Sequence, residues 1–206
     1  RPPGGQNPRH GVGAQTALFA CELGWFRVLE ARGIRPSVMI GHSFGEITAL
    51  AAAGVWEVDT ALDVVAARIR AAEQIAGGGG PALAMASLIC SEDQRDAILG
   101  LDPERLVLTN INAPGRFVIS GEREAVVRAV TVAESFGADA RLLPIGAAFH
   151  SRYMEPAREP FGAAVSALEC RPPRIPILST ITGEYVRTDG FDPSYLGRSE
   201  EHTSEL

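Results

Sequence analysis

The sequence predicts an α/β protein in which a parallel-sheet domain carries an inserted, smaller ferredoxin-like unit. Three observations predict it. A short apolar run leads into a glycine-bounded serine and then a helix, as in a parallel sheet. In the middle of the chain, strands and helices follow the order β-α-β-β-α-β, which is that of a ferredoxin-like unit. Finally, 206 residues with 46% hydrophobic residues are enough to bury a full core.

The first third of the chain has the pattern of helix, strand, helix and helix. Apolar residues recur at helical spacing over residues 14–32, and Gly33 ends that helix. The run over 37–40 is typical of a buried parallel strand, and further helices are expected over 46–53 and 60–75, before a Gly-rich break at 77–80. The apolar residues of the first helix are Leu18, Cys21, Trp25, Val28 and Leu29.

After the break the pattern changes to short, alternating strands and helices. We expect a large α/β subdomain from residues 1–81 and 144–197, and a ferredoxin-like subdomain over 82–143. A helix over 151–168 and a strand over 175–179 return the chain to the main sheet. The elements of the inserted unit are strands over 82–88, 106–110, 117–120 and 140–143, and helices over 92–99 and 122–136.

Composition excludes several classes of function. A net charge of −6 argues against nucleic-acid binding, and no apolar run is long enough for a membrane span, nor is a signal peptide visible. The three cysteines, Cys21, Cys90 and Cys170, are odd in number and far apart, which favours reduced, buried thiols. We therefore expect a cytoplasmic protein without a zinc site.

Residues 198–206 lack apolar periodicity and match one translated frame of a common sequencing adapter. We expect an artefactual tail there, and His202 is left out of the functional reasoning.

A glycine-bounded serine follows the first predicted strand. The run Gly41-His-Ser-Phe-Gly45 fits G-x-S-x-G between a strand and a helix, the context of a nucleophile turn in an α/β-hydrolase-like domain. We expect glycine at both ends because a Cβ at either would crowd the neighbouring strand or helix. The turn would hold the hydroxyl of Ser43 at the carboxyl end of the sheet, and the backbone N–H of Phe44 would stabilise an oxyanion.

A serine hydroxyl needs a base, and the sequence has four histidines. Besides His202, His10 lies in the irregular start of the chain, and His42 adjoins the serine, so its side chain is expected to brace the turn. His150 follows a predicted strand and begins a helix, where catalytic groups gather. We therefore predict Ser43 as nucleophile and His150 as its base.

These residues resemble those of malonyl-CoA:acyl-carrier-protein transacylases and the acyltransferase domains of polyketide synthases. The resemblance covers nearly all of residues 11–190, and an inserted ferredoxin-like unit is also a feature of that family. Its motifs are GHSxGE at residues 41–46, AFHS…MEP at 147–156, N-x-N-x-P with V-I-S-G at 110–114 and 118–121, and TQxALFA at 15–20.

The resemblance implies a residue for the acyl carboxylate. The family places an arginine 25 residues after the serine, and Arg68 stands there. Helical spacing supports this choice, since Arg68 shares a face with Val64 and Val65. Arg70 instead shares a face with Asp63. An arginine on the inward face needs an anionic partner, which the malonyl group would provide.

The resemblance further implies that the substrates are malonyl-CoA and the phosphopantetheine thiol of an acyl carrier protein, in polyketide or fatty-acid synthesis. It implies no bound cofactor and no metal. Further synthase domains would be covalently linked to this one. Gln15, His42 and Phe44 complete the implied substrate-binding set. Phe149, directly before the base, resembles the Phe-His pair of malonyl-selective relatives, whose ring leaves no room for an α-methyl branch.

Two positions depart from the family pattern: Ile69 replaces a glycine and Ala147 replaces a histidine.

Two other interpretations stay open at this point. A carboxylesterase or thioesterase shares G-x-S-x-G and would place an acid before the histidine, for which Asp102 and Asp139 are candidates. A buried Arg68 argues against a neutral ester pocket. The chain could also be an inactive fragment, because the family's N-terminal GQGxQ motif and the segment that anchors the base are absent from it.

Overall fold

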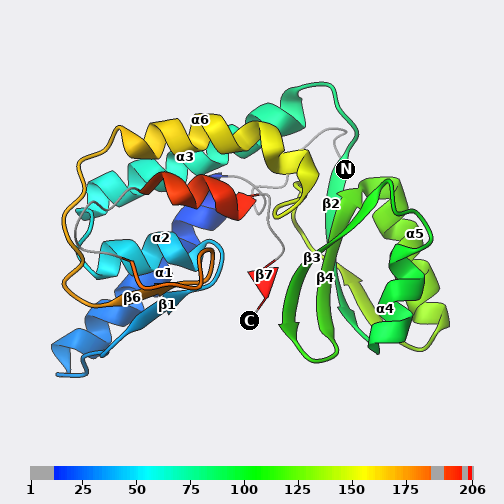
Figure 1. Ribbon diagram of the computed structural model, residues 1–206, viewed down its shortest axis with the longest axis horizontal. Coiled ribbons are helices and arrows are strands. Elements are labelled where there is room, and N and C mark those ends of the chain that lie inside the picture. The colour runs from blue at the N-terminus through cyan, green and yellow to red at the C-terminus, as the bar shows by residue number, and fades with distance from the viewer. Residues whose placement is uncertain (1–11, 187–192, 201–203, 206) are drawn as a thin grey trace, which may run out of the picture. The chain divides into compact units, whose positions relative to one another are not determined.

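The computed structural model describes residues 12–186, 193–200 and 204–205 (Figure 1). The chain divides into two compact units. The first comprises Arg1–Ala71 and Pro160–Gly197, and the second comprises Ala72–Glu159 and Arg198–Leu206. The division therefore falls inside α-helices over 58–77 and 155–166 and inside a 3-10 helix over 193–200, and the second unit extends beyond the predicted 82–143 at both ends.

The first unit contains a two-stranded parallel sheet covered by helices. Strands β1 and β6 pair in parallel, from Met39 opposite Ile177 to Gly41 opposite Ser179, which confirms that the chain returns to the main sheet. Helix α2 packs on β1 and on α1. The elements are α1 (Val12–Ala31), β1 (Met39–Gly41), α2 (Gly45–Ala52), α3 (Val58–Gly77), α6 (Glu155–Ser166), β6 (Ile177–Ser179) and the 3-10 helix η2 (Pro193–Glu200).

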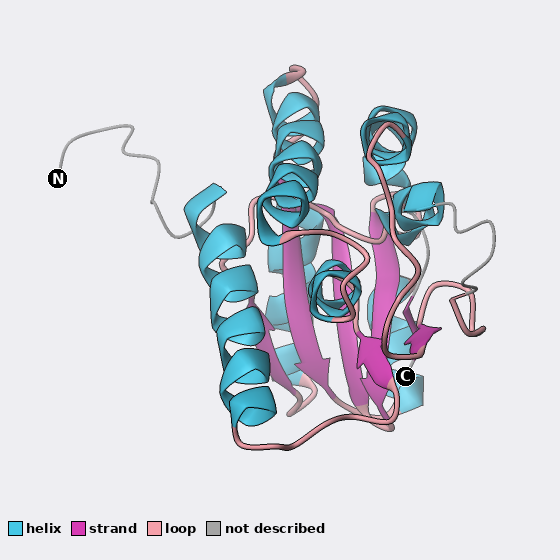
Figure 2. Ribbon diagram, turned by 90° about the vertical axis from the view of Figure 1, so that its left-hand side faces the viewer, coloured by secondary structure: helices cyan, strands magenta, loops and turns pink. Residues whose placement is uncertain are grey.

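The second unit contains a sheet in the order β5-β2-β4-β3-β7, whose strands Figure 2 shows side by side. β2 pairs antiparallel with β4 and β5, and β3 pairs antiparallel with β4 and parallel with β7. The predicted order β-α-β-β-α-β is confirmed. The elements are β2 (Leu83–Ile89), α4 (Glu92–Leu99), β3 (Leu106–Ala113), β4 (Arg116–Glu122), α5 (Arg123–Ser135), β5 (Asp139–Leu142), the 3-10 helix η1 (Arg152–Met154) and β7 (Ser204–Glu205).

Alanine allows α5 to pack closely on this sheet. Ala125, Ala129 and Ala133 recur every fourth residue and are fully buried, so one narrow stripe of α5 faces β2, β4 and β5. Helices α4 and α5 lie on the same side of the sheet in Figure 1. The sheet contributes larger side chains to this core, Leu88, Phe117 and Ile119 among them.

The expected burial of the cysteines is wrong, and the apolar spacing of α1 did not identify the residues that this helix buries. Helix α1 forms as predicted, but the residues that it buries are Phe19 and Leu23, whereas Trp25 is 69% exposed. The apolar residues extend around much of this helix, so their spacing did not single out the inner stripe. The cysteines form no disulfide in the described part of the chain, and they are not buried: Cys21 is exposed and Cys90 and Cys170 are half-buried.

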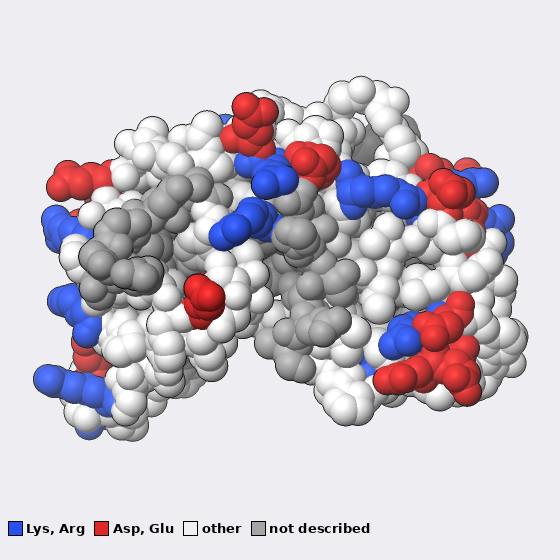
Figure 3. All heavy atoms as spheres, viewed as in Figure 1, with Lys and Arg blue, Asp and Glu red and all other residues white. Residues whose placement is uncertain are grey.

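The end of the chain is partly described. Residues 198–200 belong to η2, and 204–205 form β7 beside β3, neither of which was predicted. His202 lies outside the described residues, and an artefactual origin for residues 198–206 stays a prediction. No helix in the described ranges is long and apolar enough to cross a membrane. On the face drawn in Figure 3, arginine and acidic side chains alternate instead of forming a basic stripe.

Candidate active site

Ser43 lies in the sharp turn between β1 and α2. Its φ is +53°, a left-handed conformation that non-glycine residues rarely adopt and that costs free energy. Two backbone hydrogen bonds close the turn, from Gly45 N–H to His42 O at 2.9 Å and from Glu46 N–H to Ser43 O at 3.1 Å. The predicted strained strand–turn–helix geometry is thus present at the predicted nucleophile.

The two glycines of the turn have different roles. A Cβ at Gly41 would lie 2.2 Å from the carbonyl oxygen of Gly45, so this position requires glycine. A Cβ at Gly45 would have no heavy atom within 4 Å. The prediction that a side chain at Gly45 would crowd its neighbours is therefore wrong, because the space beside this first residue of α2 is open.

His42 is half-buried, and its Nε2 atom lacks a hydrogen-bond partner in the described part of the chain. Burial lowers the pKa of His42 below its ordinary value, because desolvation disfavours the charged imidazolium. No hydrogen bond from Nε2 braces the turn, and a role for His42 in substrate binding stays a prediction.

Arg68, Gln15 and Phe44 come together in the first unit. Arg68 lies on the buried face of α3 with 6% exposure, as helical spacing predicted, and Arg70 on the same helix is exposed. The Nη1 of Arg68 donates to Gln15 Oε1 at 2.8 Å. Its guanidinium carbon lies 5.8 Å from the ring centroid of Phe44, a cation–π distance. Because Phe44 is the residue after Ser43, a buried cation is held beside the nucleophile turn.

Glu46 is a site residue to which the sequence reasoning gave no role. Although it lies in the first turn of the apolar helix α2, its side chain is fully buried and accepts hydrogen bonds from the segment 179–181 and from Tyr195. The available signal was a lone carboxylate in the run Gly45-Glu-Ile-Thr-Ala-Leu50, since a buried carboxylate needs partners.

His150 belongs to the second unit and is also conformationally strained. Its φ is +61° and its side chain is 3% exposed. The residues that follow it fix the backbone: Ser151 Oγ donates to Ala148 O at 2.5 Å, and Arg152 donates to the carbonyl oxygen of Glu104. Phe149, directly before His150, is half-buried. Among non-glycine residues of the described ranges, Ser43 and His150 have positive φ.

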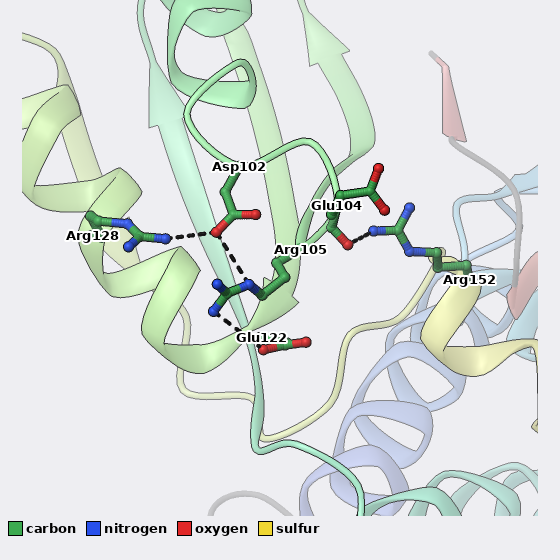
Figure 4. A network of polar contacts seen from close by, with 6 residues as sticks. All are labelled: Asp102, Glu104, Arg105, Glu122, Arg128 and Arg152. Carbon is green, nitrogen blue, oxygen red and sulfur yellow. Dashed lines mark hydrogen bonds and ion pairs between the residues drawn. The ribbon is translucent and has the colours of Figure 1, made fainter.

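Asp102 and Asp139, the candidate acids of a hydrolase triad, have other partners, and Figure 4 shows those of Asp102. Asp102 Oδ2 lies 2.7 Å from Arg128 Nη2 and 3.3 Å from Arg105 Nε. Asp139 pairs with Arg141 at 3.1 Å. Both carboxylates are thus engaged in ion pairs on the ferredoxin-like unit, which weakens the carboxylesterase interpretation.

The family model for the acyl transferase domain matches residues 9–205 of this chain. The chain belongs to the acyl transferase domain family. Among curated proteins, it is 34% identical over 192 residues to polyketide synthase GfsE of Streptomyces halstedii, covering 93% of this chain and 5% of that protein. It is 36% identical over 170 residues to erythronolide synthase EryA3 of Saccharopolyspora erythraea, covering 82% of this chain and 5% of that protein.

Solved structures place this acyl transferase domain in the same fold. The acyltransferase domain from the second module of the salinomycin polyketide synthase has a TM-score of 0.78 and 33% identity, covering 96% of this chain and 46% of the other. A malonyl CoA-acyl carrier protein transacylase from Burkholderia pseudomallei has a TM-score of 0.83 and 26% identity, covering 96% and 67%. The predicted fold class is confirmed, and the chain spans about half of the salinomycin synthase domain.

Several site assignments within the acyl transferase domain stay predictions. The structure brings Gln15, Phe44 and Arg68 together within the first unit. Ser43 belongs to the first unit and His150 to the second, so their pairing as nucleophile and base is an expectation for experiment. No group of three or more His, Cys, Asp or Glu side chains in the described ranges could hold a metal ion.

Proposed function

We propose that this acyl transferase domain moves a malonyl group from coenzyme A to Ser43 and then to the phosphopantetheine thiol of an acyl carrier protein, in polyketide or fatty-acid synthesis. The observation that carries the proposal is the buried Arg68, held by Gln15 against the ring of Phe44, next to the strained Ser43. Its similarity to polyketide synthases and to malonyl CoA-acyl carrier protein transacylases supports the proposal.

In the first half-reaction, Ser43 Oγ attacks the thioester carbonyl of malonyl-CoA while His150 takes the hydroxyl proton. The carbonyl oxygen becomes an oxyanion, which backbone N–H groups such as that of Phe44 stabilise. The carbon–sulfur bond then breaks, coenzyme A leaves as a thiol with the proton from His150, and a malonyl-serine ester remains.

In the second half-reaction, the carrier protein's phosphopantetheine thiol attacks the ester. It gives its proton to His150, which returns that proton to Ser43 Oγ as the ester bond breaks. The acyl group leaves as a thioester on the carrier protein, and the serine is free again. The cycle is therefore a ping-pong acyl transfer between two thiols.

Arg68 would select the substrate through its free carboxylate. A guanidinium has five N–H donors in a planar fork that matches a carboxylate, and the contact with Gln15 uses one of them. An uncharged acyl group would leave the buried cation without this anionic partner, which disfavours its binding. The hydrogen bond to the Gln15 amide orients the guanidinium.

Phe149 would refine this selection at the α-carbon of the acyl group. A ring beside His150 would exclude an α-methyl branch, but a single methyl group distinguishes substrates by only about 1–3 kcal/mol. We therefore expect a preference for malonyl over methylmalonyl groups and not an absolute exclusion.

The test is a matched pair of substitutions on one helix, made in the protein that carries this chain. Arg68→Ala should lower malonyl transfer by about 100-fold, the order of losing a charge-assisted contact to substrate. It should leave or raise acylation by neutral thioesters such as acetyl-CoA. Arg70→Ala, which changes an exposed arginine of the same helix, should leave both rates unchanged.

Comparing the rates of Arg68→Ala with malonyl-CoA and with acetyl-CoA separates this proposal from an esterase, whose ester pocket would be neutral. Unchanged malonyl transfer by Arg68→Ala would contradict the role of Arg68. An equal loss with malonyl-CoA and acetyl-CoA would show that Arg68 serves the structure of the turn and not recognition of the carboxylate.

A further inference from the structure

Glu46 is a buried anion in the first turn of α2, three residues after Ser43, with 0% exposure. Its Oε1 accepts from Thr180 N–H at 2.6 Å and from Ser179 Oγ at 2.9 Å, and its Oε2 accepts from Tyr195 O–H at 2.8 Å. The N–H of Ile181 lies 3.3 Å from Oε1. Every one of these partners is a donor, which is what a carboxylate requires when it is removed from water.

The donors come from segments far from Glu46 in sequence. Ser179 ends β6, Thr180 follows it, and Tyr195 lies in η2. Burial raises the pKa of the Tyr195 hydroxyl, and the charge of Glu46 and the hydrogen bond to it raise this pKa further. Tyr195 therefore stays protonated and remains a donor. One carboxylate thus joins the start of α2 to two later segments of the first unit.

Thr180 connects this carboxylate to the other end of the turn. Its hydroxyl oxygen lies 2.9 Å from Gly41 O and 3.1 Å from Glu46 Oε1, so its single proton can be donated to either acceptor. Gly41 precedes Ser43 by two residues and also pairs with Ser179 in the parallel sheet. Thr180 therefore contacts the backbone before Ser43 and the side chain after it.

We propose that Glu46, acting through Thr180, is the positioning residue that holds the Ser43 turn in its reactive conformation. The inference rests on the proposed function of Ser43 as nucleophile. A non-glycine residue with φ of +53° persists only where the surroundings fix it. Hydrogen bonds to an ionised acceptor, about twice as strong as neutral ones, provide this constraint from the segment 179–181.

The experiment measures acylation of Ser43 by malonyl-CoA in single turnovers, in the protein that carries this chain. Thr180→Val keeps the shape of the side chain and the backbone donor but removes the hydroxyl. It should slow acylation about tenfold, the order of one hydrogen bond, with the substrate concentration for half-maximal rate unchanged. Thr180→Ser, which retains the hydroxyl, should restore the rate.

A second set of variants tests the carboxylate itself. Glu46→Gln keeps the size and one acceptor oxygen but presents an N–H₂ group in place of the other oxygen. It should slow acylation by about 10- to 100-fold, as misplacement of a reacting group does. The matched control is Glu22→Gln, because Glu22 accepts a hydrogen bond from Thr48 of the same helix α2 without touching the turn. This control should acylate at the wild-type rate.

The outcomes separate this inference from the proposed function. If the wild-type protein is not acylated, or Ser43→Ala is acylated equally, the proposed function is wrong. If the wild type is acylated on Ser43 and both Thr180→Val and Glu46→Gln react at its rate, the positioning role is wrong.

A lower unfolding temperature with an unchanged acylation rate would show a structural role alone, which also overturns the inference. Should Glu46→Gln fail to fold, the Thr180 pair decides. Slow acylation by Thr180→Ser as well as Thr180→Val would then contradict the inference.

Discussion

At the scale of single residues, the candidate residues include two strained positions and two buried charged side chains. Ser43 and His150 both have positive φ, and Arg68 and Glu46 are both buried. The sequence could predict the strain at Ser43 from G-x-S-x-G and the burial of Arg68 from its helical face. It could not predict the partners of Glu46, because Thr180 and Tyr195 are more than 130 residues away and no spacing rule relates them.

The two glycines of the turn should respond oppositely to the same substitution. Gly41→Ala should lower the free energy of unfolding by about 3 kcal/mol or more, because its Cβ would overlap the backbone of Gly45. Gly45→Ala should be neutral or stabilising by up to ~1 kcal/mol, since it adds a good helix former in open space at the start of α2. Urea unfolding measures both. Equal destabilisation would contradict the asymmetry.

The stability of the first unit should depend on pH through His42. In the folded protein the pKa of His42 lies below its ordinary value of about 6.5, whereas in the unfolded chain the pKa is close to that value. Between these two values the unfolded state holds more protons, so the free energy of unfolding falls as the pH falls. His42→Gln should make this decrease shallower.

An NMR titration of the His42 imidazole gives the direct check of this pH dependence. Its midpoint should lie below about 6.5. A midpoint at or above that value, or an unchanged acid slope in His42→Gln, would contradict the burial effect.

At the scale of secondary-structure elements, local rules predict the second unit better than the first. Helix α4 spans the predicted residues 92–99, and Ser91 and Gln94 form a reciprocal capping box at its start. Helix α1 forms too, but which of its residues are buried depends on contact with α2, so Trp25 is exposed and Phe19 is buried. Strand β7 was missed because two residues carry no periodicity.

The capping box makes α4 sensitive to one exposed serine. Ser91→Ala removes the acceptor for the N–H of Gln94 and should lower the free energy of unfolding by about 1 kcal/mol. The control is Ser135→Ala near the end of α5, where the hydroxyl donates back to Val132 O within its own helix. That change should stay within about 0.5 kcal/mol. A similar decrease in the free energy of unfolding for both substitutions would show that the capping hydrogen bond of Ser91 does not stabilise α4.

At the scale of the whole molecule, the family and the fold could be predicted from four ordered motifs and the βαββαβ order. The acyl transferase domain model covers residues 9–205, and the solved relatives share the fold. The limits of the two units could not be predicted, because they lie inside the helices α3, α6 and η2 and not at breaks between elements. The proposed chemistry takes its nucleophile, Ser43, from the first unit and its base, His150, from the second, and this pairing stays a prediction.

The central claim is that Ser43 accepts a malonyl group with His150 as its base, and mass spectrometry of the protein after incubation with malonyl-CoA tests it most directly. The account predicts one malonyl ester, located on the peptide that contains Ser43. The ester should be absent from Ser43→Ala, strongly reduced in His150→Ala, and discharged by a phosphopantetheinylated carrier protein. An ester on another residue, or equal labelling of His150→Ala, would contradict the account.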